Sequence, residues 1–312
     1  MRELVPVIII DYFTADRTRQ CIEDFKRNIY GADLCFVIVD NSNDENNFKK
    51  LINNLTLNKT IIYKSDIYYN KNDKLIFINP KENIGFAKGN NLGFKVVKRF
   101  YNFNECLFSN NDVHVGKFDI AKMISDLRKN PKIAVVGPKV IGLDGKDQSP
   151  EEFKSIFKRY WKRGLLYPLN SSKIRKNIKL KNKYAINNES VEYSGYVYRV
   201  IGAFMLCDAV KFEQVGGFDE HTFLYAEELI LSEKLKKYGY KTYFDCKLKV
   251  VHEGGYSTQR AFENDKRDKL KLDSDLYYYE KYVGTPKFII QLTTIIMDIY
   301  SLKYKLVHKI IR

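Results

Sequence analysis

The sequence predicts an α/β fold in which a mostly parallel β-sheet carries helices on both faces and is followed by a helical C-terminal tail. Over residues 1–140, short apolar runs alternate with stretches whose apolar residues recur at helical spacing. The first run, VPVIII at residues 5–10, is apolar throughout, as expected of a strand that is covered on both faces. This alternation is typical of a parallel sheet built from βαβ units.

Each further element rests on a similar pattern. The helix predicted over 14–30 has Ile22, Phe25 and Ile29 on one face. The other predicted strands are 34–40, 74–80, 105–112 and 133–138; the other helices are a polar one soon after 40, then 86–100 and 117–129. Apolar structure resumes over 196–210, followed by two strands, 241–245 and 247–252, and a charged helix.

A basic segment separates these two series of elements. From Phe153 to Asn188 there are eleven Lys or Arg residues and no Asp or Glu, which indicates a loop-rich insertion over about residues 153–188. We therefore expect one domain over 1–284, with halves over about 1–145 and 190–284, and a separate tail over 285–312.

The net charge limits the kinds of partner that we expect, and the cysteine content indicates the cellular compartment. With 53 Lys or Arg and 38 Asp or Glu among 312 residues, the net charge of +15 favours an anionic partner, simple solubility being the alternative. We find no nucleic-acid-binding motif and expect no nucleic-acid partner. The five Cys residues form no CxxC pair, which favours a reducing, cytoplasmic compartment. No apolar stretch reaches the roughly 18 residues of a spanning helix, and the N-terminal run is too short for a signal peptide.

Polar residues follow four successive predicted strands at the point where each strand ends. The first strand ends at Asp11, the second at Asp40 and Asn41, the third runs into 80–91, and the fourth ends on 109–112 (SNND). In an open parallel sheet these carboxyl ends meet at one edge, where ligands bind. A single Asp at such a place is commonly a turn residue or a helix cap, but four ends together favour a nucleotide pocket.

The residue types suggest a role for each part of this pocket. Asp40 can accept a hydrogen bond from a pyrimidine ring N–H, and the NIGFAKGNN stretch at 83–91 offers backbone N–H groups near a helix start for a diphosphate. The stretch is neither a GxGxxG nor a P-loop motif. Asp112 is a hard oxygen ligand for Mg²⁺ or Mn²⁺, the alternative being a turn or helix-capping residue.

Seven motifs occur in one order over roughly residues 4–282. They are 7–14 (VIIIDYFT), 37–46 (VIVDNSNDEN), 83–94 (NIGFAKGNNLGF), 107–113 (LFSNNDV), 137–145 (GPKVIGLDG), 202–228 (GAFMLCDAVKFEQVGGFDEHTFLYAEE) and 250–257 (VVHEGGYS). Together they resemble glycosyltransferase family 2, with its Rossmann-like GT-A fold, and especially its bacterial rhamnosyltransferase-like members.

The resemblance implies an inverting transfer of a sugar, rhamnose or another hexose, from a nucleotide diphosphate to a hydroxyl of a growing, lipid-linked bacterial surface polysaccharide. It implies an acceptor base and Mg²⁺ or Mn²⁺ beside the departing diphosphate. The matching residues are Glu228 and Glu227 for catalysis and Asp112 and His252 for the metal. We assign donor binding to Asp11, Tyr12, Asp40, Asn41, Asn83, Gly85, Lys88, Asn90, Asn110 and Asn111.

The sequence departs from the family pattern in two places. The acidic pair is normally Glu-Asp with another Asp two residues later, whereas here it is Glu227-Glu228 with Ile230. The familiar Asp-x-Asp is reduced to Asn110-Asn111-Asp112, which predicts a low metal affinity. These departures support an alternative function, a non-catalytic sugar-nucleotide-binding or scaffold subunit of a glycosyltransferase complex.

The residues around Glu228 support its role separately. On a helix that starts near Leu224, Glu228 shares the apolar stripe of Leu231, Leu235 and Tyr238, and a carboxylate on such a stripe is costly unless it is used. The alternative is a solvated Glu in the first turn of the helix. For His252 the alternative is a hydrogen-bonded structural histidine.

The tail predicts an amphipathic helix. Ile295, Ile299, Leu302, Leu306 and Ile310 share one helical face, and Lys or Arg residues occupy other positions. Together with the basic stretch 154–183, this helix could bind an anionic membrane surface and hold the protein on the inner face of the cell membrane. The alternative is a helix packed on the domain or on a partner subunit, as in a homodimer.

Overall fold

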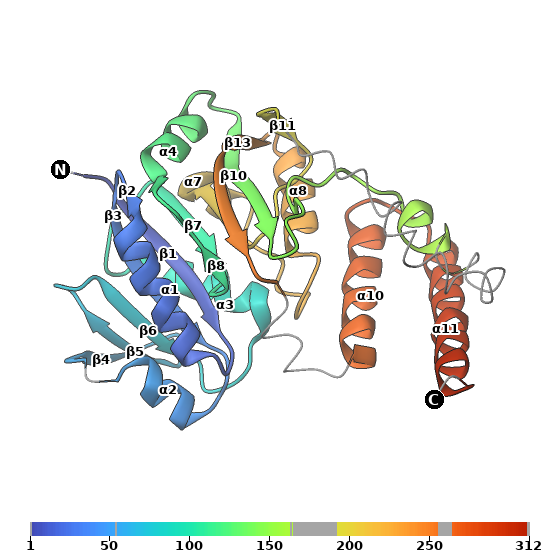
Figure 1. Ribbon diagram of the computed structural model, residues 1–312, viewed down its shortest axis with the longest axis horizontal. Helices are drawn as coiled ribbons and strands as arrows, with labels where there is room; N and C mark the ends of the chain where they lie inside the picture. Colours follow the sequence, from blue (N-terminus) through green and yellow to red (C-terminus); the bar gives the residue numbers. More distant parts are fainter. Residues whose placement is uncertain (1, 54, 163, 165–191, 255–263, 311–312) are drawn as a thin grey trace. The chain divides into compact units, whose positions relative to one another are not determined.

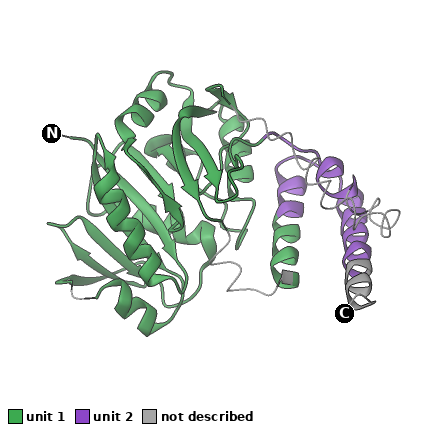
Figure 2. Ribbon diagram, viewed as in Figure 1, with its two compact units in different colours: residues 1–151, 191–274 green, residues 152–190, 275–312 purple. Residues whose placement is uncertain are grey.

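The computed structural model describes residues 2–53, 55–162, 164, 192–254 and 264–310. The chain divides into two compact units, which Figure 2 shows in different colours: unit 1 comprises residues 1–151 and 191–274, and unit 2 comprises 152–190 and 275–312. The predicted basic insertion and the predicted tail therefore fall in the same unit. Most of the insertion lies outside the described residues.

Unit 1 is built on one large sheet whose strands follow the order β11-β13-β10-β12-β7-β1-β3-β6-β5-β4, with β8 paired to β13 (Figure 1). The strands are β1 Leu4–Asp11, β3 Asp33–Asp40, β4 Asn58–Ile62, β5 Ser65–Asn70, β6 Leu75–Asn79, β7 Glu105–Ser109, β8 Val113–His114, β10 Ile133–Gly142, β11 Gly195–Val197, β12 Phe204–Asp208 and β13 Lys241–His252. A separate small sheet pairs β2, Ile29–Tyr30, with β9, Phe118–Asp119. The central strands β7, β1, β3 and β6 are parallel, as predicted.

The flanks of the sheet differ from the prediction. The hairpin β4–β5 adds an antiparallel edge that was not predicted, and β12 runs antiparallel between β7 and β10. The two strands predicted over 241–245 and 247–252 form the single strand β13. Its pairing with β10 shifts register between Pro138 and Lys139, so an irregularity within one strand lies where two separate strands were predicted.

The helices cover both faces of the sheet. They are α1 Ala15–Asn28, α2 Glu45–Leu51, α3 Gly85–Val97, α4 Ile120–Arg128, α7 Ala209–Gln214 and α8 Glu227–Lys237; a further helix, α10 Asn264–Lys281, begins in unit 1 and ends in unit 2. Side chains alternate along β1, so Val7 and Ile9 join one core with residues of α1, α2 and α4. Ile8 joins the other core, with residues of α3, α7 and α8.

Strand register brings the polar strand ends together, as predicted. Along β1 and β3, Asp11 lies opposite Asp40. In the next parallel pair, Ile9 of β1 lies opposite Ser109, the last residue of β7. The segment 110–112 therefore leaves the sheet at the same edge as Asp11 and Asp40.

Unit 2 contains the π-helical turn η1, Phe157–Trp161, the C-terminal end of α10 and the helix α11, Lys287–Ile310. A buried ion pair joins Arg159 Nε to Asp275 Oδ2 at 2.8 Å, and the Tyr160 hydroxyl donates to the same oxygen. Burial and the nearby Asp275 carboxylate raise the pKa of Tyr160. The Trp161 indole N–H donates to Thr293 Oγ1 at 2.8 Å, which ties η1 to α11.

A substitution of Phe108, in β7, tests the aromatic packing next to the carboxyl edge of the sheet. Its side chain is 1% exposed, and its ring centroid lies 4.8 Å from that of Phe212 and 5.1 Å from that of Phe218. We expect Phe108→Ala to lower the free energy of unfolding by about 3–5 kcal/mol in urea denaturation, because it leaves a cavity. Leu143→Ala, at a residue that is 71% exposed, is the matched control and should change it by less than about 0.5 kcal/mol. Equal losses in the two variants would contradict this packing.

Candidate active site

The carboxyl edge of the sheet holds a buried polar network around Asp11. Its Oδ2 accepts hydrogen bonds from the hydroxyls of Thr14 at 3.0 Å and Thr18 at 2.6 Å, and its Oδ1 accepts from Asn47 Nδ2 at 2.6 Å. Asn111 Nδ2 donates to both of these hydroxyls, each at 2.7 Å. Asp11 and Asn111, both predicted to contact the donor, are thus engaged within the protein and fix the start of α1 beside the strand ends.

Asp40 is buried beside this network. Its Oδ1 accepts from the Ser42 backbone N–H at 2.9 Å and from Asn47 Nδ2 at 3.1 Å. Burial raises the pKa of Asp40 to about 6; the hydrogen bonds from Ser42 and Asn47 oppose this rise, and the charge of Asp11 adds to it. The carboxyl of Asp40 therefore gains or loses its proton at a pH of about 6, close to neutrality.

The loop before α3 is tied to neighbouring segments. Asn41 Nδ2 donates to the Gly85 carbonyl at 2.9 Å, and Asn83 Oδ1 accepts the Gly85 N–H at 3.0 Å. The Phe86 N–H donates to the Phe223 carbonyl at 2.8 Å. Gly85 has a φ of +80°, and a Cβ there would lie 2.5 Å from the Phe223 oxygen. Both N–H groups are paired within the protein, so the predicted diphosphate contact would have to come from other groups of this loop.

The remaining predicted donor residues occupy the rim and interior of this region. Lys88 is exposed on α3, whereas Asn90 is buried and donates to the Phe86 carbonyl at 3.0 Å. Tyr12 is half-buried, with its ring edge-on to Phe13 at 4.8 Å between centroids. Phe13 is 49% exposed and has a φ of 56°, an unfavourable backbone conformation for a bulky residue that is typical of functional loops.

Asp112 and His252 face each other at the same edge. The pairing of β8 with β13 and a hydrogen bond from the Glu253 N–H to the Asp112 carbonyl, at 3.0 Å, bring the two segments together. Asp112 Oδ1 lies 3.2 Å from His252 Nε2. Burial alone would raise the pKa of Asp112, but the hydrogen bond and charge of His252 and the charge of Arg17 hold it below its usual value.

Gln148 sets the orientation of the histidine. Gln148 Nε2 donates to the His252 carbonyl at 3.3 Å, which leaves Gln148 Oε1 to accept the His252 Nδ1–H at 2.7 Å. In the neutral ring the Nε2 lone pair then points toward Asp112 Oδ1 and the Asn110 amide, whose Nδ2 is 3.2 Å away. With a neutral ring, His252 Nε2 and Asp112 Oδ1 are two acceptors 3.2 Å apart, which repel each other unless a proton or a cation lies near both. A metal ion is one such cation, and these two atoms could be its ligands.

Charged residues surround this pair at a greater distance. Arg17 Nη1 lies 2.6 Å from Glu253 Oε2, and His114 Nε2 lies 2.7 Å from Glu253 Oε1. Among the described residues, no group of three or more His, Cys, Asp or Glu side chains could hold a metal ion. A cation at Asp112 and His252 would therefore need further ligands from a substrate or water.

Helix α8 begins later than predicted. The expected start near Leu224 is wrong: the helix begins at Glu227, after Tyr225 and Ala226, which have φ values of 75° and 66°. Leu231 and Leu235 are buried, as expected of the predicted stripe, but Tyr238 is 51% exposed. Left-handed backbone at two non-glycine residues is unfavourable, and it places the acidic pair at the first turn of α8.

The two glutamates of the pair differ in environment. Glu227 is buried at 3% exposure, whereas the Glu228 side chain is 20% exposed. Glu228 Oε1 accepts the Gly202 N–H at 2.8 Å, and Oε2 lies 3.9 Å from Arg199 Nη1. Arg199 is itself buried and also pairs with Glu151. Glu228 is thus the more accessible carboxylate, and it is held by Gly202, the first residue of the motif that Glu228 ends.

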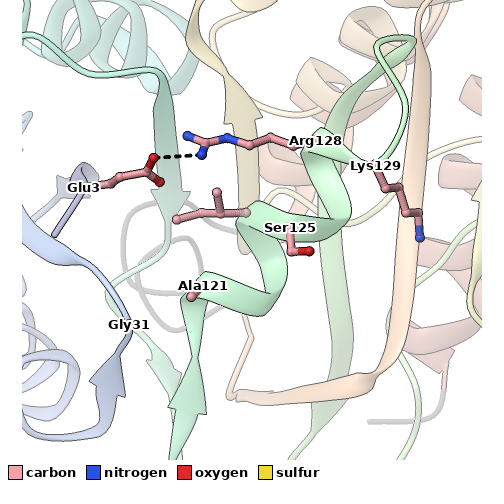
Figure 3. A pocket seen from close by; sticks show the side chains of 7 residues that line it. Glu3, Gly31, Ala121, Ser125, Arg128 and Lys129 are labelled. Carbon is pink, nitrogen blue, oxygen red and sulfur yellow. Dashed lines mark hydrogen bonds and ion pairs between the residues drawn. The ribbon is translucent and has the colours of Figure 1, made fainter.

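A hollow of about 470 Å³ lies elsewhere in unit 1 (Figure 3). Its lining residues are Glu3, Gly31, Ala121, Ile124, Ser125, Arg128 and Lys129. Glu3 immediately precedes β1, and Asp11 ends that strand, so the hollow is at the opposite edge of the parallel strands from the predicted site. An ion pair of 2.7 Å between Arg128 and Glu3 crosses it. No predicted site residue lines it.

Comparison with known proteins identifies the fold. No protein-family model and no curated protein sequence matches the chain. Among solved structures, GalNAc-T7 with UDP, GalNAc and Mn²⁺ matches with a TM-score of 0.58 and 14% identity, over 90% of this chain and 48% of that chain. The mannosyltransferase PcManGT from Pyrobaculum calidifontis, in complex with GDP-Man and Mn²⁺, matches with a TM-score of 0.52 and 13% identity, over 92% and 66%. The chain thus spans about half and two thirds of their lengths, and it has the GT-A-type fold of these glycosyltransferases, as predicted.

Proposed function

We propose that the protein is a glycosyltransferase that moves a sugar from a nucleotide diphosphate to a hydroxyl group, with inversion at the anomeric carbon. The observation that carries this proposal is the Asp112–His252 pair at the carboxyl edge of a GT-A-type sheet, where Asp11 lies opposite Asp40. The structures of similar fold hold UDP, GalNAc and Mn²⁺ in one case and GDP-Man and Mn²⁺ in the other. We assign the same classes of ligand, a nucleotide sugar and a divalent cation, to this chain.

Asp112 and His252 fit Mg²⁺ or Mn²⁺. Asp112 supplies a carboxylate oxygen, and His252 supplies an Nε2 lone pair whose direction is fixed by Gln148. Two protein ligands leave positions for diphosphate oxygens and water, which is the usual arrangement for Mg²⁺. A cation bound there would neutralise the charge that develops on the diphosphate as it departs.

Asp40 is the residue that we assign to the nucleotide base. Its Oδ1 accepts hydrogen bonds from the Ser42 N–H and from Asn47, and we assign the acceptance of a ring N–H to Oδ2. Tyr12 and the exposed Phe13, which follow Asp11 directly, supply aromatic surface at the same strand end. The ionised form of Asp40 is the stronger acceptor, so we expect donor binding to favour a pH above about 6.

Glu228 is the residue that we assign as the acceptor base. Its Oε1 is held by the Gly202 N–H, and its side chain is more exposed than the buried Glu227. The acceptor hydroxyl gives its proton to Glu228 while its oxygen bonds to the anomeric carbon and the bond from that carbon to the diphosphate breaks. A single displacement of this kind inverts the anomeric configuration.

The acceptor that we propose is a growing, lipid-linked bacterial surface polysaccharide, and the transferred sugar is rhamnose or another hexose. This part rests on the resemblance of motifs such as 83–94 and 202–228 to bacterial rhamnosyltransferase-like proteins. An enzyme with such an acceptor would work at the inner face of the cell membrane.

The metal assignment predicts the behaviour of Asp112→Ala. We expect the variant to keep its fold and to lose at least about a hundredfold in turnover, because it loses a metal ligand beside the leaving group. Release of the nucleoside diphosphate from the sugar nucleotide that gives the largest thermal shift measures this. Asp144→Ala, at an exposed carboxylate, is the matched control. Full activity of Asp112→Ala, or undiminished wild-type activity in excess chelator, would contradict the metal assignment.

The base assignment predicts different outcomes for Glu228→Gln and Glu227→Gln. Glu228→Gln keeps the size of the side chain but cannot take a proton, so the rate should fall about a hundredfold or more while the donor still binds. Single-turnover kinetics and donor titration separate these two effects. A normal rate for Glu228→Gln with a slow Glu227→Gln would move the base to Glu227. If both variants are active, the proposed mechanism is wrong; if the wild type neither transfers nor hydrolyses any donor that it binds, the scaffold alternative holds.

The raised pKa of Asp40 predicts a conflict between stability and binding. The folded protein holds the ionised carboxyl unfavourably, so stability falls as pH rises from the ordinary pKa of 3.8 to about 6, and the full cost applies above that pH. Asp40→Asn should therefore stabilise the fold at pH 7.5 by up to about 3 kcal/mol and by less at pH 5, and should weaken donor binding. Urea denaturation at both pH values and donor titration test this. A gain in stability that is the same at both pH values would contradict it.

A further inference from the structure

We propose that unit 2 binds the surface of an anionic lipid bilayer through an exposed apolar stripe on α11. The stripe consists of Phe288, Leu292, Ile295, Ile299 and Leu302. This inference concerns where the protein sits and does not depend on the proposed reaction.

The stripe is a continuous apolar face of one helix. Its residues are 65%, 40%, 54%, 44% and 62% exposed, and their spacing of four, three, four and three places them on one side of α11. Large apolar side chains gathered in this way mark an interaction site more often than single exposed ones do. The structure confirms that Ile295, Ile299 and Leu302 lie on one exposed face; the side chains of Leu306 and Ile310, also predicted there, are not among those that the structure describes.

A different side of α11 makes the contacts within unit 2. Thr293 is fully buried and accepts a hydrogen bond from the Trp161 indole, and Ile296 is 8% exposed, with its side chain against Gly164. Thr293 and Ile296 are not members of the stripe. The stripe is therefore not the surface that holds α11 to η1.

The charge of unit 2 indicates which kind of partner covers the stripe. By sequence, unit 2 has seventeen Lys or Arg residues and five Asp or Glu residues, so it carries +12 of the net charge of +15. The four-three spacing alone would also suit a coiled coil with a second copy. Two copies of unit 2 would repel each other. An anionic bilayer instead suits both features of the unit, because its head groups attract the positive charge and its acyl region takes up the apolar stripe.

The geometry suits a helix that lies along the surface. No helix in the described part of the chain is long and apolar enough to cross a membrane. Gln291 and Asp298 are exposed along one border of the stripe, and Ser301 is exposed further round the helix, so the polar border would lie at the water side while the stripe enters the boundary between head groups and acyl chains.

Cosedimentation of the full chain with vesicles tests the proposal. Vesicles of phosphatidylglycerol and phosphatidylcholine should capture the wild type at low salt, and pure phosphatidylcholine vesicles should capture much less. Capture should weaken as salt screens the head groups. The triple variant Ile295→Ser, Ile299→Ser, Leu302→Ser should bind at least about tenfold more weakly. The matched control, Gln291→Ser with Ser301→Ala, should bind as the wild type does, and circular dichroism should show that all three proteins are folded.

Three results would overturn the proposal. The first is a wild type that ignores anionic vesicles at low salt. The second is a triple variant that binds them as well as the wild type does, which would mean that charge alone attracts the protein. The third is a wild type that is dimeric in solution by light scattering and ignores vesicles, with the triple variant monomeric; the stripe would then pair with a second copy.

Discussion

The arrangement of the site depends on the parallel register of β1 against β3, in which Asp11 lies opposite Asp40. Because side chains alternate along a strand, a slip by one residue would exchange the side chains of β1 between the two cores, each of which is closely packed, and would separate Asp11 from Asp40. The two hydrophobic cores therefore fix the register, and the register in turn fixes which polar residues meet at the carboxyl edge. Since β7 pairs with β1 in the same way, the segment that carries Asp112 emerges beside them.

Bringing two carboxylates together in a buried place is unfavourable unless their oxygens are hydrogen-bonded. Asp11 is satisfied by hydroxyl and amide groups, and Asn47 donates to both Asp11 and Asp40. Asp40 is less well compensated, as its raised pKa shows. The network thus makes Asp11 part of the framework and leaves the ionised form of Asp40 less stabilised. A ligand that donates a hydrogen bond to Asp40 would therefore stabilise it.

The other half of the site depends on contacts between segments that are far apart in the chain. The short strand β8 pairs with the end of β13 and so carries Asp112 to His252, while Gln148, from a third segment, orients the ring. Glu228 is held in a similar way by the Gly202 N–H, at the first turn of a helix that follows two residues with positive φ. The unfavourable backbone conformation before α8 thus sets the direction in which the acidic pair points.

The sequence by itself determined the central parallel sheet, its helices and the gathering of Asp11, Asp40 and Asp112 at one edge, because the spacing of apolar residues encodes which face of an element is buried. It did not determine the start of α8, the continuity of β13, or the roles of Gln148 and Thr18. A polar side chain carries no periodic signal, and its partner is chosen only when the sheet assembles. Only the tertiary structure could show the contacts of Gln148 with His252 and of Thr18 with Asp11, because the sequence carries no signal that pairs these residues.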